Sequence, residues 1–137
     1  MFFVRPNGLA GLLLACALLA SLQEAGAFEL SGAWSSDAEL CDRVFTREGD
    51  KVIFAELSDL YGSGFVINGD RIIGKAAHCT IESTKQNNDS LELSAACASS
   101  IMNQNVKFSL KIIDDNTIDR TIEEIPGMTL KYSRCKI

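Results

Sequence analysis

Short segments in which apolar and polar residues alternate recur along this chain, and each is followed by a polar turn. Residues 105–113 are an example, because Val106, Phe108, Leu110 and Ile112 fall on one side of an extended backbone. A period of two residues is typical of a strand with one buried face. After residue 27, no stretch of about eleven residues shows a helical period. The pattern therefore predicts an all-β meander.

Turn residues mark where the strands end. In the segment Asn68-Gly69-Asp70 the Asn-Gly pair favours a hairpin, since both residues tolerate a positive φ. Residues 36–40 allow one short helical turn, with Ser35 or Ser36 as its cap. A meander on so few residues favours a small closed antiparallel barrel of about eight strands, which has no exposed edges. A two-sheet sandwich is the alternative. The expected strands cover residues 30–35, 43–47, 51–57, 64–67, 71–75, 77–84, 90–98, 105–113, 117–122 and 128–135.

The first 27 residues have the pattern of a signal peptide. Arg5 provides the positive charge, residues 9–22 form an apolar run, and residues 25–27 (Ala-Gly-Ala) form a small-residue cleavage site before Phe28. The run is too short for a membrane span, which needs about 20 residues. Lipidation at Cys16 is the alternative to ordinary cleavage. We expect a periplasmic or secreted protein.

Cleavage leaves residues 28–137, which is enough for a single domain. The net charge of −5 is unchanged, because Arg5 and Glu24 are removed together. An acidic domain without a basic stripe is a poor binder of nucleic acid or of anionic membranes. We expect a monomer without a transmembrane segment, and an exported or envelope protein as its partner.

The cysteine residues of this domain predict two disulfides. Their number is even, their spacing contains no C-x-x-C, and the domain has a single histidine, so a zinc site is not expected. The four residues are Cys41, Cys79, Cys97 and Cys135.

Hairpin geometry selects the pairing of these cysteines. If the turn at residues 85–89 is centred near Asn88, residues 79 and 97 lie opposite one another. The same register places Ile81 opposite Ala95 and Ser83 opposite Leu93. We therefore predict the disulfides Cys79–Cys97 and Cys41–Cys135, the alternative being one bridge and two free thiols.

The two ends of the domain resemble those of lipocalin-like (calycin) barrels. An opening G-x-W motif is present as Gly32-Ala33-Trp34, and Arg134 follows Met128, Leu130 and Tyr132 on one face of the closing strand. The resemblance implies that Trp34 fills one end of the barrel and that Arg134 packs across it. Stacking on the indole would stabilise the arginine there by about 0.5–2 kcal/mol.

Size, signal peptide and motif together are similar to those of the small lipocalin-like inhibitors of bacterial secreted metalloproteases. In that family an arm ahead of the first strand enters the protease cleft, which implies a protein partner. Here only residues 28–31 precede Gly32, and two disulfides are expected where the family usually has one.

Catalytic and metal chemistry find no support in the residue pattern. His78 has no matching nucleophile or second ligand, and Asp114-Asp115 and Glu123-Glu124 fall in expected turns. We expect no catalytic residues, no cofactor and no bound metal. An enzyme would need polar groups converging on His78 or on these acidic turns.

We therefore expect an exported non-enzymatic binding protein, such as a protein-facing inhibitor or accessory factor of the cell envelope. Its contacts are expected in two loops, at Tyr61, Ser63, Phe65, Asn68 and Asp70. The alternative is a carrier that holds a small apolar ligand inside the barrel. That function predicts a cavity lined by Val106, Phe108, Leu110 and Ile112.

Overall fold

The structure of the protein is a computed structural model that describes residue 3 and residues 26–137. Most of the expected signal peptide, including Cys16, lies outside the described residues. Among the described residues, no helix is both long enough and apolar enough to cross a membrane.

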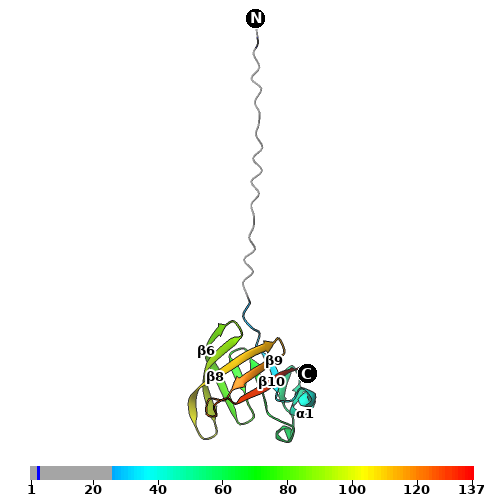
Figure 1. Cartoon of the computed structure of the whole chain (residues 1–137). Coiled ribbons are helices and arrows are strands. Elements are labelled where there is room, and N and C mark those ends of the chain that lie inside the picture. The colour runs from blue at the N-terminus through cyan, green and yellow to red at the C-terminus, as the bar shows by residue number, and fades with distance from the viewer. Residues whose placement is uncertain (1–2, 4–25) are drawn as a thin grey trace.

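Eight antiparallel strands close into a barrel in the order β1-β10-β9-β8-β7-β6-β5-β4 (Figure 1). This confirms the small all-β barrel predicted from the alternation and excludes the two-sheet sandwich. The strands are β1 (Gly32–Ser35), β4 (Gly64–Asn68), β5 (Arg71–Ile73), β6 (Ala77–Asn87), β7 (Ser90–Ser99), β8 (Asn103–Asp114), β9 (Thr117–Thr121) and β10 (Thr129–Cys135).

The chain leaves the barrel between β1 and β4, so the expected run of consecutive strands is wrong there. Residues 45–54 form a separate two-stranded sheet of β2 (Phe45–Glu48) and β3 (Lys51–Phe54). A 3-10 turn, η1 (Ala38–Leu40), and one turn of helix, α1 (Cys41–Val44), precede it, and a second 3-10 turn, η2 (Ser58–Leu60), follows it.

Packing on the outer wall of the barrel explains this excursion. Val44 and Phe45 are buried against Ala33 of β1 and Val66 of β4, which face away from the interior. That contact covers the outside of the barrel while β1 pairs directly with β4.

The expected cap at Ser35 or Ser36 is also wrong, since the carboxylate of Asp37 accepts from the N–H of Glu39.

Both predicted disulfides are present. Cys79–Cys97 joins β6 to β7, and Cys41–Cys135 joins α1 to β10. Figure 1 shows α1 next to the C-terminus, on the outside of the barrel.

The register of the β6–β7 hairpin agrees with the prediction only as far as Ile81, which faces Ala95. The pairing then shifts between Ile81 and Ser83, so that Thr84 rather than Ser83 faces Leu93. A bulge places an extra residue in one strand, and alternation of apolar residues does not reveal it.

The connections between strands define two ends of the barrel. The arm end carries the connections at residues 69–70, 88–89 and 115–116, together with residues 28–31, here called the arm. The open end carries the connections at residues 57–63, 74–76, 100–102 and 122–128.

Candidate functional site

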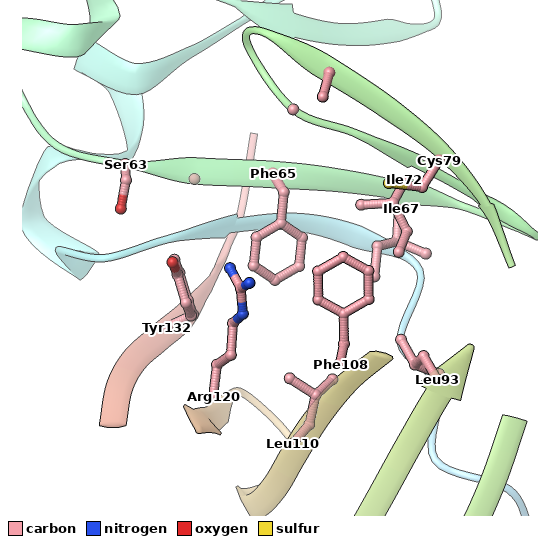
Figure 2. A pocket seen from close by; sticks show the side chains of 13 residues that line it. Ser63, Phe65, Ile67, Ile72, Cys79, Leu93, Phe108, Leu110, Arg120 and Tyr132 are labelled. Atoms are coloured by element: carbon pink, nitrogen blue, oxygen red, sulfur yellow. The ribbon is translucent and has the colours of Figure 1, made fainter. Parts of the chain in front are cut away.

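A cavity of about 320 Å³ lies inside the barrel. The strands of an antiparallel barrel alternate between inner and outer faces, and the inner residues here are mainly large and apolar. Figure 2 shows their side chains converging on one space, and they include Phe65, Ile67, Ile72, Leu93, Phe108 and Leu110. The volume lies near the lower limit of small-molecule pockets, which span about 300–1,000 Å³.

The cavity reaches the open end of the barrel. Ser63, Gly64, Gly74 and Ala77 line it, and each lies at or next to a connection of that end. At the arm end, by contrast, Trp34 and Leu30 are buried and fill the interior.

Three polar side chains face this apolar space. Arg120 comes from β9, Tyr132 from β10, and Ser63 from the segment just before β4. In Figure 2 the guanidinium of Arg120 and the hydroxyls of Tyr132 and Ser63 lie on the same side of the cavity. Tyr132 is held there by an edge-on contact with Phe65, with ring centroids 4.9 Å apart.

The guanidinium of Arg120 lies over the ring of Phe108, with its central carbon 4.9 Å from the ring centroid. Its Nε atom is buried and finds no acceptor among the described residues. Sequence reasoning missed this residue, although the alternation Ile118–Arg120 within the expected strand 117–122 places it on the inner face.

Trp34 and Arg134, expected to pack at one end of the barrel, lie directly opposite each other on β1 and β10. The guanidinium of Arg134 is centred 4.4 Å from the indole ring centroid. It also donates to the carbonyl oxygens of Glu29 at 2.5 Å, Ser31 at 2.6 Å and Asp115 at 3.1 Å.

These bonds fix the arm across the barrel end. Trp34 Nε1 donates to the carbonyl of Leu30 at 2.9 Å. The N–H of Ser31 donates to the carboxylate of Glu29, which lowers the pKa of that carboxyl below its ordinary value. The arm is therefore part of the folded barrel, because the side chains of Trp34 and Arg134 bind its backbone carbonyl groups.

The five residues expected to form binding loops do not share one surface. Ser63 and Phe65 line the cavity, and Tyr61 lies near them at the open end, with the guanidinium of Arg43 5.4 Å from its ring centroid. Asn68 and Asp70 are exposed at the arm end.

The four β8 residues expected to line a ligand cavity divide in a similar way. Phe108 and Leu110 line the cavity, while Val106 and Ile112 pack against the same core without lining it.

The ionisable residues considered for catalysis lie apart. His78 is exposed on β6, opposite Ala98. Asp114 and Asp115 lie at the arm end, and Glu123 and Glu124 at the open end. Within residues 26–137, no group of three or more His, Cys, Asp or Glu side chains could hold a metal ion.

Fold and cavity together define the class of this protein, which is a disulfide-braced, closed eight-stranded antiparallel barrel with an apolar interior space. Comparison with protein-family models, curated proteins and solved structures finds no match for the chain.

Proposed function

We propose that this protein is an exported, non-enzymatic, lipocalin-like carrier that binds a small, largely apolar molecule inside its barrel. The observation that supports this most is the cavity of about 320 Å³. Protein interiors are normally packed as densely as organic crystals, and voids larger than a water molecule are few. A domain of this size that keeps such a space gives up core packing, and ligand binding is a reason to do so.

The difference between the two ends of the barrel also supports a carrier. The arm end is filled by Trp34 and tied by Arg134, whereas the cavity reaches the open end. A ligand would enter at the open end and rest against Phe65, Phe108 and Leu110.

Two disulfides are typical of proteins that work in an oxidising compartment. Together with the signal-peptide pattern of residues 1–27, they support a periplasmic or secreted carrier.

A protein-facing inhibitor or accessory factor is the second candidate, supported by exposed apolar side chains in connections of the open end. Their exposed fractions are large, and they are Leu57 at 63%, Leu60 at 73%, Ile101 at 86%, Met102 at 53% and Ile125 at 51%. Clusters of exposed apolar residues often mark contacts with other proteins.

Binding of the neutral fluorophore N-phenyl-1-naphthylamine tests the carrier directly. We expect saturable fluorescence enhancement with the wild-type protein. Ala77→Phe, which places a ring in the cavity, should weaken binding by about tenfold or more. The matched control is Ala98→Phe, which places the same ring outside the cavity, in a shallow surface hollow on β7, and should leave affinity unchanged.

Equal weakening by both substitutions, or none with either, would contradict a site inside the barrel. A double variant, Leu60→Ser with Ile101→Ser, distinguishes binding in the cavity from binding to the exposed apolar side chains of the open end. It should leave fluorophore binding unchanged, and loss of binding in this variant would move the site to the open-end loops.

A further inference from the structure

Arg120 brings a positive charge to a cavity that is otherwise lined by apolar side chains and the hydroxyls of Tyr132 and Ser63. Arginine side chains carry their charge throughout the physiological range, and a charge withdrawn from water is costly unless it is paired. The side chain of Arg120 is partly buried. The cavity lining contains no carboxylate, and Arg120 has no ion-pair or hydrogen-bond partner among the described residues. By comparison, Arg134 donates three hydrogen bonds at the arm end.

Stacking on Phe108 does not remove this imbalance. A cation over an aromatic face is attracted to it by about 0.5–2 kcal/mol. The N–H groups of a guanidinium, however, point outward in its own plane, so stacking leaves them without acceptors. The buried Nε of Arg120 is one such group.

The neighbouring hydroxyls indicate what kind of acceptor fits. Tyr132 and Ser63 direct their hydroxyls to the side of the cavity where the guanidinium lies (Figure 2). The planar fork of an arginine matches a carboxylate, which accepts two parallel hydrogen bonds from it. Because the single, partly buried cation balances one negative charge, a monoanion fits better than a dianion.

We propose that the ligand is a monocarboxylate with a short apolar body, whose carboxylate pairs with Arg120 while its hydrocarbon part packs against Phe108, Leu110 and Leu93. This inference rests on the proposed carrier function and specifies its ligand class. Arg120 would be the residue that distinguishes the acid from a neutral molecule of the same length.

A head-group series at constant chain length tests the proposal. Octanoate, 1-octanol and octylamine would each compete with the bound fluorophore at a pH of about 7. We expect octanoate to bind the wild-type protein about tenfold or more tightly than 1-octanol, and octylamine to bind most weakly. Arg120→Met should reduce octanoate affinity by about tenfold and leave 1-octanol affinity unchanged.

Arg71→Met is the matched control, because Arg71 is exposed on the outer face of β5. It should leave the affinities of all three compounds unchanged.

Acidification gives a second readout that needs no variant. Octanoate affinity should fall as pH drops through the ligand's own pKa, about 4–5 for an aliphatic carboxyl, because the anion is the form that pairs. The affinity of 1-octanol should stay constant over that range.

The outcomes separate this inference from the carrier function. Equal binding of octanoate and 1-octanol by the wild-type protein would overturn the role of Arg120 and leave the carrier standing. Failure of all three compounds and of the fluorophore would overturn both. If Arg120→Met does not fold, the wild-type head-group series and its pH dependence decide alone.

Discussion

Arg134 joins three segments at the arm end of the barrel, since it stacks on Trp34 and donates to the arm and to the β8–β9 turn. Arg134→Met should lower the free energy of unfolding by about 2–4 kcal/mol, through lost charge-assisted hydrogen bonds and stacking. Arg134→Lys should recover only part of this, because an ammonium lacks the planar fork. Urea denaturation measures both, with Arg71→Met as the control that changes little. Equal stability of Arg134→Met and the wild type would show that the arm is held by other contacts.

Arg120 is expected to behave in the opposite way in the empty protein. Replacement of an unpaired, partly buried charge by an apolar side chain of similar length is often neutral or stabilising. Arg120→Met should therefore raise the midpoint of thermal unfolding without ligand, by about 2–6 °C if the gain is near 1 kcal/mol. Differential scanning calorimetry on ligand-free protein measures it. A clear loss of stability would indicate that Arg120 serves the fold.

Lys75 links the β5–β6 connection to η2. Its ammonium donates to Ser58 at 2.7 Å and to the carboxylate of Asp59, with which it forms an ion pair, and this lowers the pKa of that carboxyl below its ordinary value. A carboxyl whose pKa is lower in the folded state than in the unfolded state stabilises the fold at any pH above its unfolded-state pKa. This stabilisation is lost as the pH falls through the folded-state pKa. The effect lies below about pH 4 and is small, since the pair is exposed. An NMR titration should show the Asp59 pKa rising in Lys75→Met, and an unchanged pKa would refute the ion pair.

Single residues differed in how well the sequence predicted their places. Trp34 and Arg134 lie where the G-x-W motif and the alternation of the last strand suggested. Arg120 has the same alternation with Ile118, but no local signal shows that the facing strands lack an acid. An unpaired charge depends on the whole interior, and a pattern within one strand does not report it.

At the scale of elements, Gly64 allows β4 to approach β1 and the ring of Phe45 closely. A Cβ at this position would lie 2.5 Å from the carbonyl oxygen of Trp34 and 2.8 Å from the ring of Phe45. Gly64→Ala should therefore cost about 1–3 kcal/mol, as overpacking does. Gly69→Ala is a useful comparison, because its added Cβ meets open space and only its positive φ is strained, at about 1–2 kcal/mol.

Chemical denaturation of the two variants measures how much free energy of unfolding each substitution removes. Exchange of β1 and β4 amides in the native state adds a local readout, because Gly64→Ala should speed it and Gly69→Ala should not. A Gly64→Ala variant as stable as the wild type would show that β1 and β4 can move apart without loss.

The elements themselves were largely predictable. Each barrel strand falls within or next to an expected segment, because half-buried strands alternate regularly. The sequence did not predict that β2 and β3 form a separate sheet, since alternation shows that a segment is a strand but not which sheet it joins. The bulge after Ile81 was not predicted either, because one extra residue changes the register of a strand pair without changing its composition.

At the scale of the whole molecule, the two disulfides close loops of very different length. Cys79 and Cys97 are 18 residues apart and already face each other in a hairpin, whereas Cys41 and Cys135 are 94 residues apart. The chain-entropy account gives about 3 kcal/mol for the shorter loop and about 4.5 kcal/mol for the longer one. Replacement of Cys41 and Cys135 by alanine should therefore destabilise the protein more than the same change at Cys79 and Cys97.

Guanidinium denaturation of the two double-alanine variants, each with one disulfide intact, ranks the bridges. A larger loss at Cys79–Cys97 would contradict the loop-length argument and show that the β6–β7 hairpin depends on its own bridge.

The pairing of β1 with β10 has a consequence for how the protein is made. Ribosomes release a chain from its N-terminus, so Trp34 meets its cross-strand partner Arg134 only when β10 has emerged. Until then one edge of β1 stays open, and the half-built wall offers unpaired backbone to any neighbouring chain. Newly made molecules are therefore open to edge-to-edge association with neighbouring chains until β10 has paired with β1.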